Sequence, residues 1–590
     1  MSKETIFNLT LFKRLISYIK PYKRIFLFSL LCTLLLAAVS PFRPIIIGRI
    51  VSDYIVRDKS VDLLLKWTIV VVILLLFEAV LNFLSSYFSN LLAQSIIRDL
   101  RKKMVGHILL FNTKYFDKTP VGAMVTRVVS DIEAISEVFS AGLMEIFSDL
   151  LTLIVVLCAM LYLNWELTLL TMIPIPILFF ATRIFAKAMQ ASFQLERQQV
   201  TRLNTFVQER ITGISIVQLF GRQKKEMESF DEINNVHRQA HVKAVWANSI
   251  FFPIVELLSS LSIAFLLVYG ALRYSGKSSG DIQLMVGEVV GFTLFINMMF
   301  RPIRQLADKF NVLQRGIVRA DRVFAVMDLN EEVQSSGHLL EVDFKQDVHF
   351  KDVSFAYVDE QFVLKNINLD IESGSTIAFV GATGAGKSSM INLLSRLYDF
   401  QKGEISIGDV DIKDIDLELL RKNIAVVLQD VFLFSDTIHN NITLGDTSIS
   451  RAQVIEAAKS VGAHDFIMEL PDGYDFEVGE RGGVMSVGQR QLLSFIRAVV
   501  YNPQILVLDE ATSSIDNESE ELIQKATEVL TSKEHFAGRT TIIIAHRLST
   551  IQKADKIIVL DKGQIIEQGS HSELLKQNGA YKKLYDMQFN

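Results

Sequence analysis

Cysteine is nearly absent from this sequence. Among 590 residues only Cys32 and Cys158 carry a thiol, and both fall within long apolar runs. Two thiols in such positions exclude a disulfide framework and a cysteine-based metal cluster as the basis of the fold or of its chemistry. The net charge of -5 indicates no particular class of partner.

Charge is scarce in six stretches of the first half of the chain. Half of all residues are apolar, and they gather in runs with at most one acidic side chain each: 25–42, 67–97, 150–165, 167–182, 244–272 and 282–300. With its flanks, each run approaches or exceeds the ~20 residues that a bilayer requires. One such run also fits a buried helix of a soluble domain, but six in succession predict an α-helical membrane domain.

The basic residues predict the orientation of these spans. Lys and Arg gather before the first run, between the second and third, after the fourth and after the sixth, as at Arg24, Arg98, Arg183 and Arg301. Because cytosolic flanks carry the excess of basic residues, we expect a multi-pass protein of the cell (inner) membrane with both termini in the cytosol. The first 24 residues lack the apolar core and cleavage site of a signal peptide, so we expect no cleavage.

The clearest motif is the segment 381–388, Gly-Ala-Thr-Gly-Ala-Gly-Lys-Ser, which fits the phosphate-binding pattern G-x-x-x-x-G-K-[ST]. An apolar strand is expected before it, at 377–380, and a helix after it, at 390–398. Glycines let backbone amides surround phosphates, the Lys387 ammonium reaches the terminal phosphates, and the Ser388 hydroxyl ligates magnesium. The chain is therefore predicted to bind a nucleoside triphosphate.

The second half of the chain has the pattern of an α/β domain. Short β-branched runs at 348–355, 375–380, 423–428, 505–508, 540–544 and 556–560 alternate with helical segments, which predicts a largely parallel sheet. The run 505–508 ends in Asp509 and Glu510. Asp509 suits a magnesium ligand that acts through water or from the outer coordination shell, and Glu510 suits a general base that polarises the attacking water. We expect a membrane domain at 1–328, a linker at 329–346 and a nucleotide-binding domain at 347–590.

Taken together, these motifs carry a resemblance. The phosphate-binding loop, Gln429, the segment 485–489, Asp509-Glu510, Asp516 and the segment 545–547 are similar in kind and order to the ATP-binding cassette (ABC) ATPase. With six spans fused ahead of it, essentially the whole chain resembles a half-transporter of the multidrug-resistance type of ABC exporter. The resemblance implies an ATP hydrolase with ATP and Mg²⁺ as cofactors, which works as a dimer and moves an amphipathic compound, drug or lipid outward. A channel or regulator on the same frame is the alternative.

The resemblance also assigns roles to individual residues. Lys387, Glu510 and His546 are expected to be catalytic, Asp516 to lie in the D-loop, and Ser388, Gln429 and Asp509 to hold magnesium. The expected ATP-binding set comprises Tyr357, which stacks on adenine, with Gly381, Ala382, Thr383, Gly384, Ala385, Gly386, Lys387, Ser388, Ser389 and Gln429.

The signature segment departs from the family pattern Leu-Ser-Gly-Gly-Gln. This chain has Met485-Ser486-Val487-Gly488-Gln489, so a β-branched residue replaces a glycine that lets backbone approach the phosphate of the opposite subunit. Ser513-Ser514-Ile515-Asp516 departs slightly from Ser-Ala-Leu-Asp, and Leu492 stands where many members carry Arg. Val487 is either a tolerated variant or, as we favour, the mark of a heterodimer with a second half-transporter.

The cytosolic segments and the membrane spans give weaker signals. Apolar residues recur at helical spacing from 206 to 220, and we expect 116–122 and 209–217 to be coupling segments seated on the cassettes near Gln429; a solvated coiled pair is the alternative. The polar residues Glu78, Asn82, Glu256 and Asn297 lie within apolar spans. They either line a substrate path or bond to neighbouring helices.

Overall fold

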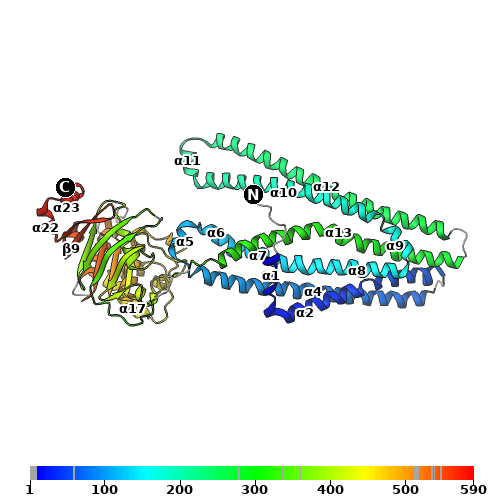
Figure 1. Ribbon diagram of the computed structural model, residues 1–590, viewed down its shortest axis with the longest axis horizontal. Helices are drawn as coiled ribbons and strands as arrows, with labels where there is room; N and C mark the ends of the chain where they lie inside the picture. Colours follow the sequence, from blue (N-terminus) through cyan, green and yellow to red (C-terminus); the bar gives the residue numbers. More distant parts are fainter. Residues whose placement is uncertain are drawn as a thin grey trace. The chain divides into compact units, whose positions relative to one another are not determined.

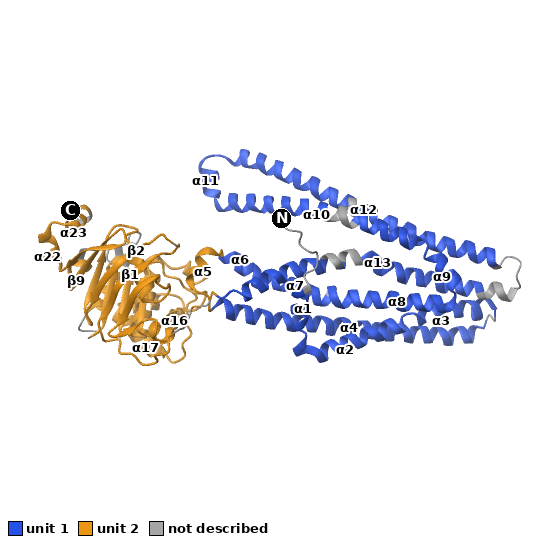
Figure 2. Ribbon diagram, viewed as in Figure 1, with its two compact units in different colours: residues 1–109, 121–330 blue, residues 110–120, 331–590 orange. Residues whose placement is uncertain are grey.

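The computed structural model describes residues 9–57, 60–274, 279–331, 333, 337–358, 360–509, 517–532, 536, 538–544 and 548–589. The chain forms two compact units (Figures 1 and 2). Unit 1 comprises Met1–Leu109 and Val121–Asn330, and unit 2 comprises Leu110–Pro120 and Glu331–Asn590. A short piece of chain between two helices of unit 1 therefore belongs to unit 2. The predicted linker boundaries at 328 and 346 remain a prediction.

The described residues of unit 1 form helices that short turns connect. Its elements are α1 (Leu9–Ser17), η1 (Lys20–Tyr22), α2 (Lys23–Val39), α3 (Phe42–Arg49), η2 (Ile50–Arg57), α4 (Val61–Ile108), α6 (Val121–Thr126), η3 (Arg127–Asp131), α7 (Ile132–Glu137), η4 (Val138–Met144), α8 (Glu145–Leu163), α9 (Trp165–Thr171), α10 (Pro174–Thr212), α11 (Ile214–Leu219), α12 (Gln223–Tyr274) and α13 (Ser279–Met327). The segments η2, η3 and η4 are π-helical.

Six stretches of unit 1 are long and apolar enough to cross a membrane, as predicted: Lys20–Arg57, Val61–Ile108, Val121–Leu163, Trp165–Phe185, Gln223–Arg273 and Met285–Gln305. The helices α4 and α12 have 48 and 52 residues, which at 1.5 Å per residue gives about 70–80 Å. That length is more than twice the ~30 Å thickness of the hydrocarbon core. The helices therefore continue well beyond the bilayer.

A close backbone contact joins α13 to the first span. A Cβ atom added at Gly287 of α13 would lie 2.4 Å from the Gly48 oxygen and 2.7 Å from the Ser52 Cβ, and one added at Gly48 would lie 2.7 Å from the Gly287 oxygen. One turn later, a Cβ at Gly291 would lie 3.3 Å from the Pro44 oxygen. Small residues let membrane helices approach this closely and gain packing energy.

Unit 2 contains two sheets. The strands are β1 (Val348–Phe355), β2 (Leu364–Ile371), β3 (Thr376–Val380), β4 (Lys402–Ile407), β5 (Val410–Asp411), β6 (Ile424–Val427), β7 (Ile505–Asp509), β8 (Thr540–Ile544), β9 (Lys556–Asp561) and β10 (Gln564–Gly569). One sheet has the order β2-β1-β4-β5 and is antiparallel, and the other has the order β10-β9-β3-β8-β7-β6. In the second sheet only β10 runs antiparallel, so the predicted parallel sheet is confirmed.

Unit 2 also contains helices, and one of them comes from the inserted piece of chain. They are α5 (Thr113–Lys118), α14 (Lys387–Leu394), α15 (Leu417–Asn423), α16 (Ile438–Thr443), α17 (Arg451–Ser460), α18 (His464–Glu469), η5 (Gly473–Asp475), η6 (Glu480–Gly482), α19 (Val487–Tyr501), α20 (Asn517–Thr531), α21 (Leu548–Gln552), α22 (His571–Gln577) and α23 (Ala580–Phe589). Alternate residues of β7 belong to two different hydrophobic clusters. The central strands are therefore buried on both faces, as in other helix-covered parallel sheets.

Candidate functional site

The phosphate-binding loop lies between a buried strand and a helix. All five residues of β3 are buried, and α14 begins at Lys387, three residues earlier than expected. Gly384 and Gly386 have φ angles of +82° and +106°, which residues with a side chain rarely adopt. A Cβ at Gly386 would also lie 2.7 Å from a methyl group of Leu364. These positions therefore need glycine, and the loop has a fixed turn that exposes its backbone.

Lys387 lies folded over this loop. Its side chain is 8% exposed, and its Nζ donates to the Gly381 oxygen at 2.6 Å and to the Ala382 oxygen at 3.1 Å. Burial lowers the pKa of Lys387, and the negative charge of Asp509 opposes that shift. An ammonium group has three donors, so one remains for a phosphate while the other two hold the loop. Ser388, the next residue, is exposed.

Two further parts of the site lie at the same edge of the six-stranded sheet as the loop. Asp509 at the end of β7 pairs with Ile544 of β8, and Phe379 of β3 pairs with the same residue. The strand β6 runs parallel to β7, and the exposed Gln429 follows it by two residues. Because the carboxyl ends of parallel strands share one edge, the loop, Asp509 and Gln429 lie on the same side of the domain.

This edge fits a magnesium nucleotide. The Ser388 hydroxyl, the Asp509 carboxylate and the Gln429 amide are oxygen donors, which are the ligands that Mg²⁺ prefers. The predicted residues Glu510, Asp516 and His546 lie outside the described residues, and their roles remain predictions. In the sequence, Glu510 directly follows Asp509, and His546 comes two residues after Ile544. Asp509 and Ile544 end the strands β7 and β8, which are adjacent in the sheet.

Tyr357, the predicted adenine-stacking residue, lies beside α14. Its hydroxyl is 3.1 Å from the Ser389 Oγ and accepts from the Asn392 Nδ2 at 3.1 Å. Its ring meets the rings of Phe355 and Tyr398 edge to face, with centroids 4.6 and 5.0 Å apart. Hydrogen bonds therefore hold Tyr357 against α14, the helix that follows the phosphate-binding loop.

The signature segment forms the start of α19. Ser486 caps the helix: its Oγ accepts from the Gln489 backbone N–H at 3.2 Å, and the Gln489 Oε1 accepts from the Ser486 N–H at 3.0 Å. Val487 is the first helical residue and is 44% exposed, whereas Gly488 and Leu492 are buried. Such a reciprocal cap stabilises a helix start. Val487 therefore does not strain its own chain, and its bulk faces outward.

The polar residues in the membrane spans differ in their surroundings. Glu78 is paired with Arg43, with 3.3 Å between Oε2 and Nη1, and its other oxygen is buried without a hydrogen-bond partner. Glu256 is paired with Arg304 at 3.0 Å. Asn297 donates to the Thr293 oxygen of its own helix at 3.1 Å, and Asn82 is exposed. The described contacts do not bring these four residues together.

Two residues that contribute to these sites were missed from the sequence. Arg43 lies just beyond the predicted end of the first span, but α3 and η2 continue that span to Arg57, so the charge belongs to the helix and needs a partner. Tyr398 donates to the Asp117 Oδ2 at 2.6 Å across 281 positions of sequence. A basic residue next to an apolar run could have indicated the contact of Arg43 with Glu78. No local pattern indicates the contact of Tyr398 with Asp117.

Comparison with known proteins gives matches over both units. Residues 26–303 match the family described as ABC transporter transmembrane region, and residues 364–513 match the family described as ABC transporter. The uncharacterized ABC transporter ATP-binding protein YknV of Bacillus subtilis is 36% identical over 100% of this chain and 96% of its own length. The ATP-dependent lipid A-core flippase of Syntrophus aciditrophicus is 35% identical over 99% of this chain and 95% of its own. The putative multidrug export ATP-binding/permease protein YgaD of Bacillus subtilis is 33% identical, over 98% and 99%.

Proposed function

The chain belongs to the ABC transporter family as an exporter half-transporter that couples ATP hydrolysis to transport, and we propose that it moves an amphipathic compound or lipid outward as one subunit of a heterodimer. One observation carries this proposal. The phosphate-binding loop and Asp509 lie at the same edge of one sheet, in a polypeptide that also has six stretches able to span a membrane. The names of two relatives, a lipid A-core flippase and a putative multidrug export protein, support the substrate class.

The chemistry of the proposed nucleotide site follows from its parts. Backbone amides of the loop and the Lys387 ammonium bind phosphate oxygens, and Tyr357 stacks on the adenine. Ser388, Gln429 and Asp509 hold Mg²⁺, which neutralises phosphate charge when bound. Glu510 takes the proton of the attacking water, and His546 orients that water and the terminal phosphate.

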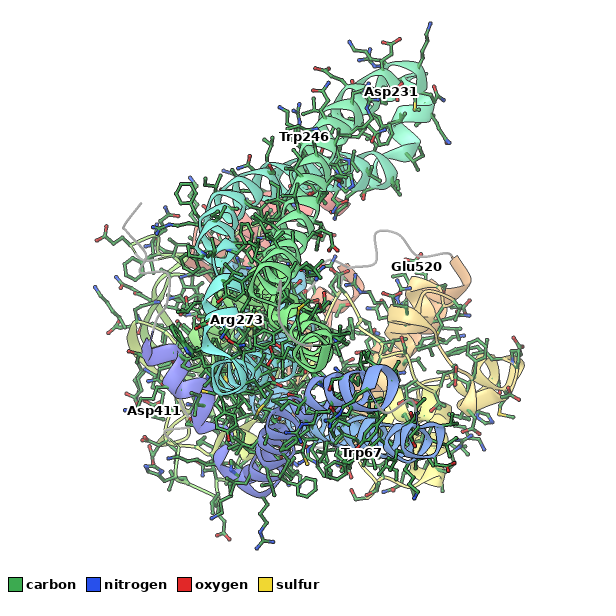
Figure 3. All side chains as sticks on the ribbon, turned by 90° about the vertical axis from the view of Figure 1, so that its right-hand side faces the viewer. Trp67, Asp231, Trp246, Arg273, Asp411 and Glu520 are labelled. Atoms are coloured by element: carbon green, nitrogen blue, oxygen red, sulfur yellow. The ribbon has the colours of Figure 1, made fainter. Side chains whose placement is uncertain are left out.

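A dimer is supported by an apolar elbow in unit 1. The turn from α10 through α11 to α12 exposes 68% of Ile211, 82% of Leu219 and 74% of Phe220. Figure 3 looks along the helices and shows the arm that leads to this elbow, labelled at Asp231 and Trp246, standing apart from Trp67 and Arg273 of the same unit. Exposed apolar groups of this size mark contact surfaces. We infer that the elbow is the coupling segment predicted at 209–217 and that it seats on the cassette of a second subunit.

Unequal subunits are supported by Val487. In the proposed head-to-tail pair, the first turn of α19 faces the γ-phosphate that the partner subunit holds. Ser486 and Gly488 present helix-end amides to that phosphate, and Gln489 holds Ser486 in its capping position. The exposed Val487 side chain stands where a glycine would leave the approach open. The site built from this chain's Lys387 and Glu510 is therefore the fast one, and the site that uses its signature is slow.

The heterodimer is tested by two substitutions in the membrane complex purified through this chain. Glu510→Gln in this chain alone should abolish nearly all ATP turnover, because it removes the base of the fast site. Val487→Gly should change turnover only modestly, because it repairs the slow site. Mass analysis of the same complex should find a second half-transporter. Robust, substrate-stimulated ATPase from this chain expressed with no other half-transporter would overturn the heterodimer.

A further inference from the structure

Hydrogen bonds join the helix α5 to the rest of unit 2, through the residues that flank it and through one of its side chains. The Asn112 N–H donates to the Glu331 oxygen at 2.9 Å, and the Val333 N–H donates to the Leu110 oxygen at 2.9 Å. Asn112 also caps α5 by accepting from the Tyr115 N–H at 2.9 Å. Although α5 interrupts the membrane unit in sequence, it is therefore built as part of the ATPase unit.

Asp117 of α5 reaches the ATPase core through Tyr398. The Tyr398 hydroxyl donates to the Asp117 Oδ2 at 2.6 Å, a short bond of the kind that a charged acceptor makes. Burial, and then this bond, raise the pKa of Tyr398, so the phenol keeps its proton at physiological pH. The phenol is therefore available as the donor of this bond.

Tyr398 in turn packs against the ring that is expected to stack on adenine. The centroids of Tyr398 and Tyr357 are 5.0 Å apart at 86°, and the buried Phe355 meets both rings edge to face, at 5.9 and 4.6 Å. Edge-to-face pairs are directional. A displacement of Tyr398 therefore changes the position of Tyr357.

Asn392 of α14 fastens the two tyrosines to each other. Its backbone oxygen accepts from the Leu397 N–H at 2.9 Å and from the Tyr398 N–H at 3.4 Å. Its side chain donates to the Tyr357 hydroxyl at 3.1 Å. The positions of both rings therefore depend on Asn392, a residue of the helix that begins at Lys387. Through Tyr398 and Tyr357, α5 is connected to the part of the site that is expected to bind the base.

We propose that Tyr398 is a positioning residue which, held by Asp117 of α5, sets the ring of Tyr357 for the adenine base. This inference rests on the proposed nucleotide binding and deepens it, because it makes the affinity for the base depend on the position of α5. A movement of the membrane helix that leads into α5 then changes the affinity for the adenine base. The phosphate side of the site is not involved in this effect. Tyr398 does not touch phosphate in this scheme.

The test compares ATP with inorganic tripolyphosphate, which has no base. Photolabelling of this chain by 8-azido-ATP in the full complex, competed by each ligand, gives two affinities for the same site. Tyr398→Phe and Asp117→Ala each remove the Tyr398–Asp117 hydrogen bond and should each weaken ATP about 2- to 10-fold, the range of one net hydrogen bond, while tripolyphosphate affinity stays the same. The double variant should be no weaker than either single one, because both remove the same contact.

Tyr581→Phe is the matched control. Tyr581 is a buried tyrosine of the same unit whose hydroxyl lies 2.7 Å from the His571 Nδ1, so its loss should leave both affinities unchanged. Equal weakening of ATP and tripolyphosphate by Tyr398→Phe, additive losses in the double variant, or wild-type ATP affinity in both single variants would overturn the inference. Failure of the wild-type complex to bind ATP would count against the proposed function instead.

Discussion

At the scale of single residues, the nucleotide site depends most on Lys387. Its ammonium lies over the loop and is buried against two of the loop's backbone oxygens. Lys387→Ala should raise the dissociation constant for ATP about 10- to 100-fold, which corresponds to the loss of one charge-assisted hydrogen bond. Equilibrium binding of a fluorescent ATP analogue measures this change.

Lys525→Ala is the control for that substitution. Lys525 lies on the surface of the same unit, where it pairs with Glu521 at 2.7 Å and is 64% exposed. Its removal should leave ATP affinity unchanged. An unaltered dissociation constant in Lys387→Ala, with the fold intact by circular dichroism, would count against the loop as the phosphate site.

Residue patterns predicted this site unevenly. The loop was predictable because its glycines, Lys387 and Ser388 are consecutive and their chemistry is local. Tyr398 was not, because its partner Asp117 lies 281 positions away and only the tertiary fold brings them together. Arg43 was missed for a related reason: its charge ended the apolar run, although the helix continues and pairs it with Glu78.

At the scale of elements, strand prediction succeeded where burial is two-sided. The strands β3, β7 and β8 have runs of apolar residues because helices cover both faces. By contrast, β2 was not predicted, since Lys, Asn and Asp alternate with its buried residues, and these types are uncommon in strands. The strand β10 lies at the edge of its sheet, and none of its six residues is buried.

The contact between α13 and the first span should tolerate no side chain at Gly287. Gly287→Ala places a Cβ 2.4 Å from the Gly48 oxygen, so the helices must separate, at a cost of about 1–3 kcal/mol. Thermal unfolding in detergent should show a lower midpoint. Gly270→Ala on α12 is the control, because the atoms nearest its Cβ would be in the Met285 and Val289 side chains at 3.6 Å, an ordinary van der Waals distance. Equal midpoints for the two variants would contradict this packing.

The pair of Arg43 and Glu78 should respond unequally to loss of either partner. The Glu78 side chain is 12% exposed and that of Arg43 is 34% exposed. Arg43→Met should therefore destabilise more, by up to about 3 kcal/mol, because it leaves a buried carboxylate without its partner. Glu78→Gln leaves a guanidinium that is only partly buried, so less of its charge is left desolvated.

Combining the two substitutions should recover part of the stability lost in Arg43→Met, because no unpaired charge then remains. Unfolding midpoints of the three variants in the same detergent decide this. If Glu78→Gln proves the more damaging single change, the pair does not have the buried, asymmetric character assigned to it.

At the scale of the whole molecule, the architecture was the most predictable feature. Six apolar stretches and a phosphate-binding loop in one chain leave few alternatives to a membrane transporter with its own ATPase. The assignment of 110–120 to the ATPase unit was only partly foreseen, because a coupling segment was expected at 116–122 without its hydrogen bonds to the linker. Those bonds join residues more than two hundred positions apart and leave no trace in local sequence.

The central claim is that ATP hydrolysis by this chain drives an amphipathic molecule across the membrane. The most direct measurement reconstitutes the complex, purified through this chain, in liposomes with the ATPase units outward and follows accumulation of a fluorescent lipid analogue or amphipathic dye inside. Accumulation against the gradient should require ATP and Mg²⁺ and should be lost with Lys387→Ala. Movement only down the gradient, or stimulated hydrolysis with no movement of either probe class, would contradict the claim and favour a channel or regulator.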